Sequence, residues 1–267
     1  MQTPWNIDFK IGLALALLVA GMGIASFFYT PYDYNEMDPA RRFIPPRMSH
    51  LMGTDSFGRD VFSRVMIGGR YTLAVSIFTV LGSAGIGASL GLISGYIGGL
   101  WDEIAMRFMD ALSSFPGILL ALVMISIMEN RPFTLITALL VLFIPSYVRI
   151  MRTGMLQYKN ADFVKTAQIM GASHLRMIFA HILPNLATPL LSATVLGLSN
   201  AILAEATMSY LGFGIQPPIP SWGRMLSESQ GFLFNAPWCA LAPGIMIMLT
   251  VIAFHYIGEG IRQRYCG

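Results

Sequence analysis

Long apolar runs separated by polar stretches dominate the chain. Six of these runs are long enough to cross a membrane: 11–29, 71–97, 104–128, 133–150, 186–211 and 237–258. About 20 helical residues span the ~30 Å hydrocarbon core of a bilayer. The alternation that is typical of a membrane β-strand is absent from the sequence. Because lipid tolerates no unpaired backbone groups, the pattern predicts an all-α, polytopic membrane protein with six transmembrane helices.

The first run, 11–29, has to be distinguished from a cleavable signal peptide. It holds 19 uncharged residues, and Lys10 is the one base before it. A signal core usually has about 7–15 apolar residues. We therefore expect a retained first transmembrane helix.

Small residues recur every four positions along the second run. They are Ser83, Gly87, Gly91, Gly95 and Gly99. Positions four apart share one face of a helix. Such a face lets another backbone approach closely, which stabilises helix pairs where lipid supplies no hydrophobic drive. We expect a helix-packing surface with no chemistry of its own.

Composition supports a membrane protein. Apolar residues make up 55% and charged residues 12% of the chain, with a mean hydropathy of +0.61. A soluble domain carries about 25% charged residues. The net charge of +3 is small and dispersed, so we expect membrane lipid and no nucleic acid as a partner. Lys and Arg are nearly balanced between the two sets of loops, so the positive-inside rule leaves the orientation open.

Patterns for catalysis and metal binding are weak. The GASLG segment at 87–91 fits GxSxG, but it lies inside an apolar helix rather than at a strand–turn–helix elbow. The four histidines form no HExxH pattern, and the two cysteines have no CxxC spacing. No lysine follows a glycine as in a P-loop. We expect no catalytic residue, no metal site and no cofactor on this chain.

Glu205 is the most unusual residue, because it lies within the apolar stretch AILAEATMSYL. An ionisable group at the centre of a membrane helix costs ~2.5–3.5 kcal/mol and usually faces a cavity or a partner. Two interpretations stay open. Glu205 is either a pore-lining or gate residue, or it forms a hydrogen bond between helices.

The polar segment 161–182 has the pattern of two short amphipathic helices joined by a tight turn. The first apolar face comprises Phe163, Val164, Ala167 and Met170, and the second comprises Leu175, Ile178, Phe179 and Ile182. Gly171 separates the helices, since glycine tolerates a positive φ at a helix end. Ser173 is suited to cap the second helix. Such a pair either lies on lipid or docks a soluble partner.

At this segment the chain resembles the permease subunits of ATP-binding-cassette importers. Their signature is an EAA-type loop with a central glycine and a later ILP. Here VKTAQIMGASHLRMIFAHILPN spans 164–185 and supplies Gly171 and the ILP. The EAA triplet reads Lys165-Thr166-Ala167, so only Ala167 matches, although the helix–Gly–helix frame is retained.

Further motifs narrow the resemblance to the second (C-type) permease of the dipeptide, oligopeptide and nickel group. They are HLMGTDSFGRDVFSR (50–64), SGYIGGLWDEIAMRFMDALSSFP (94–116), AILAEATMSYLGFGIQPPIPSWGRML (201–226) and IGEGIRQRY (257–265). These similarities cover nearly the whole chain after residue 30.

The resemblance implies a type I importer transmembrane domain in a bacterial or archaeal cytoplasmic membrane. Residues 1–70 would form the first helix and an extracytoplasmic loop, and 71–267 the permease core. The loop 161–182 would be cytoplasmic and couple to the ATPase through Val164, Lys165, Thr166, Ala167, Gly171, Ala172, Ser173, Ile182, Leu183 and Pro184. The implied partners are a homologous second permease, two ATP-binding subunits that hold ATP and Mg, and an extracytoplasmic substrate-binding protein.

The leading functional hypothesis is import of short peptides, driven by ATP that partner subunits hydrolyse. The same architecture importing nickel or another chelated metal is the alternative. A secondary transporter working alone predicts inverted repeats and several ionisable residues at the midplane, and the sequence has neither. A membrane scaffold that docks a protein other than an ATPase is the third hypothesis.

Overall fold

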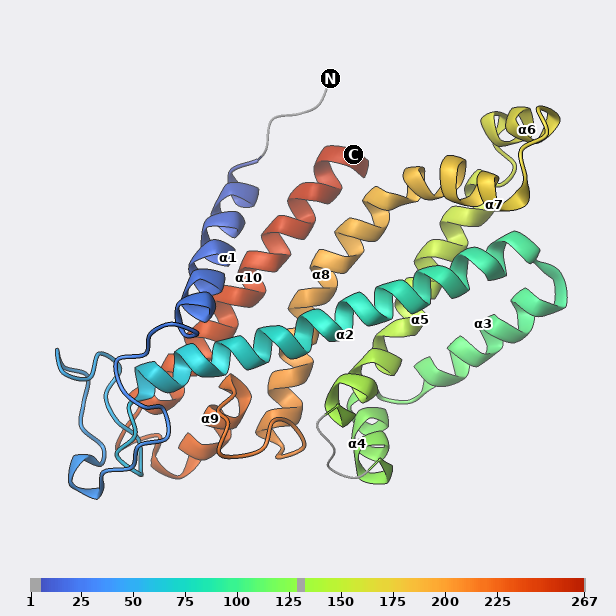
Figure 1. Ribbon diagram of the computed structural model, residues 1–267. Coiled ribbons are helices and arrows are strands. Elements are labelled where there is room, and N and C mark those ends of the chain that lie inside the picture. The colour runs from blue at the N-terminus through green and yellow to red at the C-terminus, as the bar shows by residue number, and fades with distance from the viewer. Residues whose placement is uncertain (1–5, 129–132, 267) are drawn as a thin grey trace.

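The computed structural model describes residues 6–128 and 133–266, and these are arranged almost entirely as helices (Figure 1). Among these described residues, five helices are long and apolar enough to cross a membrane. They include α1 (Ile7–Ala25), α2 (Val61–Ile97), α5 (Thr134–Tyr158), α8 (Leu183–Tyr210) and α10 (Trp238–Cys266). Within the described ranges, β structure is limited to two isolated bridges. The all-α, multi-span prediction is confirmed.

The remaining helices are short. They are α3 (Gly99–Ser114), α4 (Gly117–Ile127), α6 (Asp162–Ile169), α7 (His174–Arg176) and α9 (Trp222–Ser229). Two 3₁₀ turns at Pro39–Arg41 and Gln230–Phe232 and a π-helical turn at Met177–Ile182 complete the elements.

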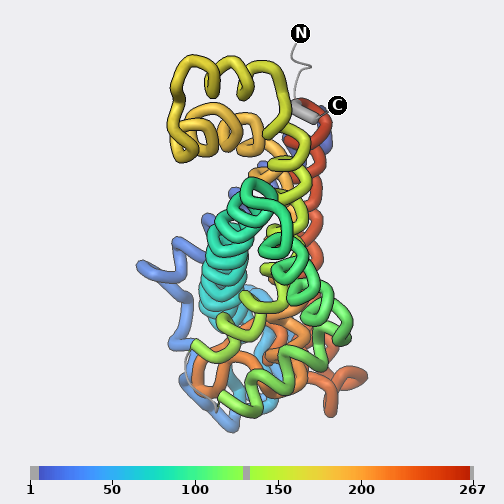
Figure 2. Tube along the Cα trace, turned by 90° about the vertical axis from the view of Figure 1, so that its right-hand side faces the viewer, coloured from blue at the N-terminus to red at the C-terminus, as the bar shows by residue number. Residues whose placement is uncertain are grey.

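The bundle has two clearly different ends (Figures 1 and 2). Helices α1, α10 and α8 lie side by side, and α2 crosses them and packs on α5. The start of α1, the end of α10 and α6 lie at one end, which we call the α6 end. The loop 26–60, α4 and α9 lie at the other end, which we call the α9 end.

The third predicted span is broken. In place of one helix over 104–128, α3 and α4 meet at an angle of 93°. Pro116 lacks a backbone N–H and disfavours helical geometry in the residue before it. Phe115 accordingly adopts an extended conformation with ψ 139°. The described structure therefore has five continuous candidate spans, and six if the bent pair crosses as one broken span.

Helix α2 begins earlier than hydropathy predicts. It starts at Val61 rather than at 71, because the Asp60 carboxylate caps it by accepting hydrogen bonds from the Ser63 amide and hydroxyl, each 2.8 Å long. Arg64 and Arg70 lie in its first turns and mask the helix in a hydropathy profile. The predicted division of the chain into 1–70 and 71–267 places its boundary inside α2. This division stays a prediction.

The small-residue face of α2 is where α5 packs. The Ser83 hydroxyl donates to the Leu140 carbonyl oxygen over 3.0 Å. A Cβ added to Gly87 would lie 2.5 Å from Tyr147 Cβ, and one added to Gly95 would lie 2.9 Å from Met155 Cβ. Gly91 faces the backbone of α5. Gly99 is different, since it begins α3 with φ +60° and an added Cβ there would meet no atom within 4 Å.

Candidate functional site

The segment 161–182 forms an arm that projects from the α6 end (Figure 1). Val164 and Ala167 are the buried residues of α6, and they point back toward the bundle. Lys165 and Thr166 lie on its exposed face. Phe163 and Met170, which the spacing placed on the same apolar face, are exposed, so only half of the predicted face is buried. One face of α6 is therefore attached to the bundle and the other is free.

A turn at Gly171 ends α6. Gly171 has φ +83°, a conformation that costs other residues energy because of their Cβ. The Ala172 amide donates to the Ala167 carbonyl oxygen over 3.0 Å. The Ser173 hydroxyl then accepts from the Arg176 amide over 3.4 Å and caps the next helix. The helix–Gly–helix geometry inferred from the sequence is present.

The second half of the arm continues directly into α8. The π-helical turn Met177–Ile182 joins α7 to Leu183 and Pro184, which occupy the first turn of α8. Proline is tolerated there because the first helical N–H groups have no intrahelical partner. The expected separate second helix is thus the beginning of a transmembrane helix. A displacement of the arm would act on α8 without an intervening loop.

Buried apolar side chains tie the arm to α5 as well. Val164, Met177 and Ile182 pack in one cluster with Met151 and Met155 of α5. Closely packed interiors transmit displacement because they have few voids. The arm is therefore coupled mechanically to both α5 and α8.

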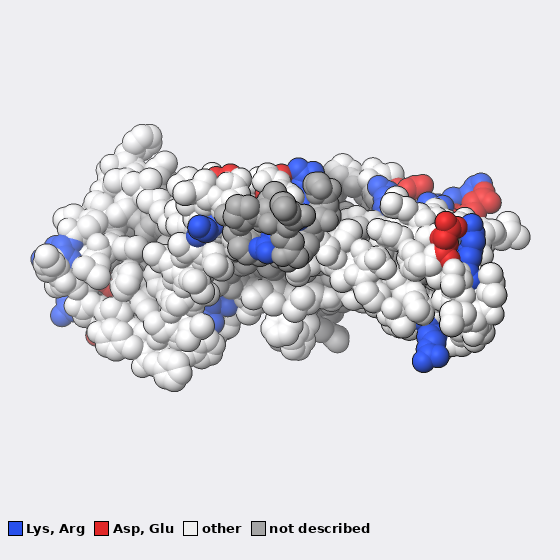
Figure 3. All heavy atoms as spheres, turned by 90° about the horizontal axis from the view of Figure 1, so that it is seen from above, with Lys and Arg blue, Asp and Glu red and all other residues white. Residues whose placement is uncertain are grey.

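The outer surface of the arm carries large apolar side chains. Ile169 is 87% exposed and Met170 is 82% exposed, and Leu175 and Phe179 are also exposed. Charged side chains of both signs gather toward the same side of the molecule when it is viewed from this end (Figure 3). An apolar patch rimmed by charges is typical of a protein-interaction surface.

Glu205 is fully buried near the α9 end of α8. Its Oε1 accepts a 2.6 Å hydrogen bond from the Ser209 hydroxyl, and the Thr72 and Ser221 hydroxyls lie beside the same carboxyl. Oε2 has no hydrogen-bond partner among the described residues. The carboxyl thus lies among hydroxyls where α8 meets α2 and the start of α9. Whether it also serves as a gate stays a prediction.

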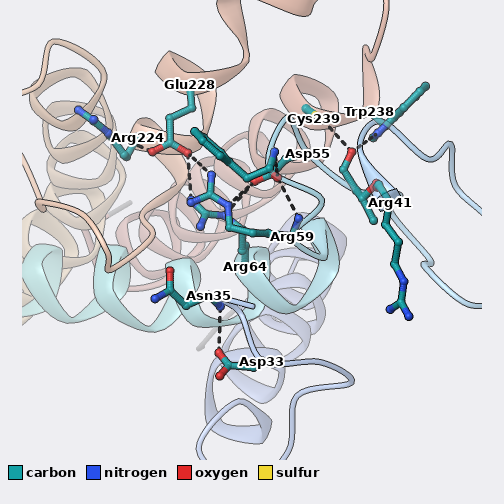
Figure 4. A network of polar contacts seen from close by, with 12 residues as sticks. Asp33, Asn35, Arg41, Asp55, Arg59, Arg64, Arg224, Glu228, Trp238 and Cys239 are labelled. Atoms are coloured by element: carbon teal, nitrogen blue, oxygen red, sulfur yellow. Dashed lines mark hydrogen bonds and ion pairs between the residues drawn. The ribbon is translucent and has the colours of Figure 1, made fainter. Parts of the chain in front are cut away.

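A network of ion pairs at the α9 end holds the 53–60 loop against α9 (Figure 4). Arg59 Nε lies 2.7 Å from Asp55 Oδ2, and Arg59 and Arg64 approach Glu228 Oε2 at 3.1 and 3.0 Å. Arg64 is almost completely buried. The charged residues in GTDSFGRD (53–60) indicate ion pairing from the sequence alone. Their partner Glu228 could not be identified in this way, because it lies far away in the sequence.

The GxSxG match and the possible metal ligands can be located in the structure. Ser89 of the GxSxG match lies within α2, where its hydroxyl donates to the Gly85 carbonyl oxygen over 2.8 Å. Across the described residues, no three His, Cys, Asp or Glu side chains gather as a metal-binding group.

The fold and the arm define a multi-span membrane protein with a docking element at one end. Residues 87–265 match the family of binding-protein-dependent transport system inner membrane components. The chain therefore belongs to this family, and it is a multi-pass inner-membrane component of a transport system.

Relatives match along nearly their whole length. The dipeptide transport system permease protein DppC of Haemophilus influenzae is 41% identical over 95% of this chain and 88% of its own. DppC of Alkalihalophilus pseudofirmus is 37% identical over 98% of this chain and 89% of its own. The glutathione transport system permease protein GsiD of Pectobacterium atrosepticum is 37% identical over 98% and 91%. The chain is thus a permease component of the ATP-binding-cassette type that the sequence motifs indicated.

Proposed function

We propose that this chain is the second permease of an importer for short peptides, driven by ATP that two partner subunits hydrolyse. Its similarity to dipeptide and glutathione permeases over 95% or more of its length carries the proposal. A homologous second permease completes the pathway, and an extracytoplasmic binding protein delivers the peptide. ATP and Mg bind to the ATP-binding subunits, and this chain holds no cofactor and performs no catalysis.

In this proposal the α6 end is cytoplasmic, and the arm 161–182 docks an ATP-binding subunit. The exposed apolar residues Ile169 and Met170 supply a docking surface. The buried residues Val164 and Met177 connect that surface to α5. Rigid packed elements shift between discrete arrangements, so closure of the ATPase would reach the spans through this cluster.

The α9 end then faces the binding protein. There the Arg59–Glu228 ion pair holds the loop 26–60 to α9, and the Arg64–Glu228 ion pair holds α2 to α9. Such a preorganised surface reduces the ordering cost of association. Glu205 lies behind this surface, and we assign it a role in gating the pathway.

Transport by the reconstituted complex tests the proposal. The complex in lipid vesicles, supplied with its binding protein, is expected to hydrolyse ATP faster and to accumulate peptide when dipeptides or glutathione are added. Stimulation by a nickel chelate but not by peptides would transfer the assignment to metal import. Vesicles that hold this chain alone, under a proton gradient, are the control for a secondary transporter. Peptide accumulation by them would overturn the ATP-driven mechanism.

A further inference from the structure

An apolar groove lies between α2, the start of α5 and the segment 213–219 that follows α8. Its volume is about 490 Å³, within the range of ~300–1,000 Å³ that is usual for ligand pockets. Four aromatic side chains line it: Tyr71, Phe78, Phe133 and Phe213. Among the described residues that line the groove, Gln216 has the one amide side chain and none is charged. The lining therefore suits an apolar occupant.

The groove lies where apolar runs of the sequence begin and end. Tyr71 is the first residue of the run 71–97, and Phe133 is the first residue of the run 133–150. Phe213 follows the end of the run 186–211 by two residues. The structure brings these three limits together at one groove. Because each run corresponds to a span, the groove lies at the edge of the hydrocarbon core, where aromatic side chains are enriched in membrane proteins.

Arg70 lies beside the groove at the same boundary. Its guanidinium carbon is 5.0 Å from the centre of the Tyr71 ring, which also lines the groove. The same carbon is 4.3 Å from the centre of the Phe27 ring, and Phe27 is close to the end of the run 11–29. A fourth apolar run thus ends at this guanidinium. The position of Arg70 at the membrane edge follows from all four runs together.

The charge of Arg70 is not neutralised by the protein. Arg59 and Arg64 at the α9 end have carboxylate partners, whereas Arg70 forms no ion pair with a described residue. Its one hydrogen bond within the described structure runs from Nη2 to the Tyr71 hydroxyl over 3.4 Å. Aromatic rings attract a cation but leave its charge and most of its five N–H donors unsatisfied. A guanidinium in this state is suited to bind a phosphate through paired N–H groups.

We infer that the groove binds a phospholipid with an anionic headgroup, so that one acyl chain lies along the aromatic side chains and the phosphate accepts hydrogen bonds from Arg70. The acyl chain matches the uncharged lining, and the phosphate matches the unpaired guanidinium at the membrane edge. Tyr71 belongs to both parts of the site and sets their spacing. A protein partner on this groove would have to supply a carboxylate at the same level, whereas every anionic phospholipid places a phosphate there. The inference goes beyond the proposed function and is independent of the cargo.

Binding of phosphatidylglycerol tests the contact with the headgroup. The chain is purified from native membranes with the subunits that accompany it, and native mass spectrometry during a titration with dioleoyl phosphatidylglycerol gives the Kd. Arg70→Gln is expected to raise this Kd about tenfold, the effect of losing one charge-assisted hydrogen bond. Arg70→Lys keeps the charge and is expected to lose less. Dioleoyl phosphatidylcholine, whose headgroup carries its own cation, is expected to bind more weakly than phosphatidylglycerol.

Arg42→Gln is the matched control for the headgroup. Arg42 also lies over an aromatic ring, at 5.9 Å from the centre of Phe43, but it does not line the groove. Its loss is expected to leave the Kd unchanged. Equal effects of Arg42→Gln and Arg70→Gln would show that lipid is attracted by positive charge in general, and would overturn the inference. Equal binding of the two lipids would overturn the anionic headgroup.

Filling the groove tests the contact with the acyl chain. Ala74 lines the groove, so Ala74→Phe is expected to occupy it and to weaken binding of phosphatidylglycerol at least tenfold, since burial of about two CH₂ groups supplies that factor. Gly85→Phe is the matched control, because it adds the same ring to an open face of α2, where no atom lies within 4 Å of an added Cβ.

A different result is expected if a second membrane subunit covers the groove. Ala74→Phe would then prevent co-purification of that subunit and leave lipid binding unchanged, which would overturn the inference. Thermal unfolding shows whether each variant is folded. The Arg70 variants decide the inference if Ala74→Phe does not fold.

Discussion

At the α9 end, charged side chains are paired with one another inside the protein, whereas at the α6 end apolar side chains are exposed. Arg64 is buried against Glu228 and links α2 to α9. Ile169 and Met170 on the arm are largely exposed to solvent. The α9 end is therefore fixed by ion pairs between its elements, whereas the arm is held by apolar packing on one face and leaves its other face free. Under the proposed function, the α9 end would be a fixed platform for substrate delivery and the arm would be the element that docks an ATP-binding subunit.

Removing one ion from the α9 end should have the largest effect on stability. Arg64→Ala removes a buried guanidinium from between the buried Asp55 and the partly buried Glu228, and loss of one partner from a buried ion pair typically costs about 3–5 kcal/mol. Thermal unfolding of the purified complex in detergent measures the loss. Arg41→Ala is the matched control, because its pair with Asp38 is exposed and is worth about 0–1 kcal/mol. Equal effects of both variants would contradict an internally stabilised α9 end.

A change at the turn of the arm should separate docking from transport. Gly171→Val places a β-branched residue at φ +83°, a strain of order 1–3 kcal/mol that is confined to the arm. We expect an inserted and assembled complex that has lost most substrate-stimulated ATP turnover. The assay is ATP hydrolysis in vesicles with loaded binding protein, and normal stimulation would count against the docking role. Gly231→Val is the control, since it changes an exposed glycine at the α9 end with no atom within 4 Å of an added Cβ.

A charge on the tip of the arm should weaken association and leave the fold intact. Ile169→Asp alters a side chain that is 87% exposed, so the free energy of unfolding is expected to change by only about 0.5 kcal/mol. Co-purification of the ATP-binding subunits is expected to fall, since the docking surface loses an apolar contact. Phe234→Asp is the matched variant on the α9 end, where an equally exposed aromatic residue is changed. Retained co-purification by Ile169→Asp would remove the tip from the interface.

Glu205→Gln should also leave the structure nearly unchanged. Glutamine has nearly the same shape and keeps an oxygen that can accept the Ser209 hydrogen bond, so the change in the free energy of unfolding is expected to be below about 1 kcal/mol. Uptake of dipeptide is expected to fall while the subunits still co-purify. Loss of the assembled complex would instead favour a purely structural hydrogen bond between helices.

Local chemistry made the arm predictable. Gly171 and Ser173 act within a few residues of their own positions, through a left-handed turn and a cap. The spans were likewise visible as apolar runs. The start of α2 was missed because its cap at Asp60 and the buried Arg64 depend on partners rather than on hydropathy.

The break between α3 and α4 is a feature that the sequence did not predict. Pro116 signalled a possible interruption, but spanning helices often continue through proline. The structure shows that the chain does break at Pro116, with α3 and α4 at 93°, and that α3 lies beside α5 with Asp102 bound to Arg152. The Arg149–Asp110 ion pair was not predicted either, because its two partners come from different helices.

The sequence by itself determined that this chain crosses a membrane, that α2 presents a packing face of small residues, and that a turned arm precedes the fifth run. These properties follow from periodicity and from backbone preferences over one or two turns. Tertiary structure alone decided that the arm continues into α8 and that Arg59 and Arg64 share Glu228. Such features depend on which helices become neighbours, and packing sets that choice over distances that local pattern does not encode.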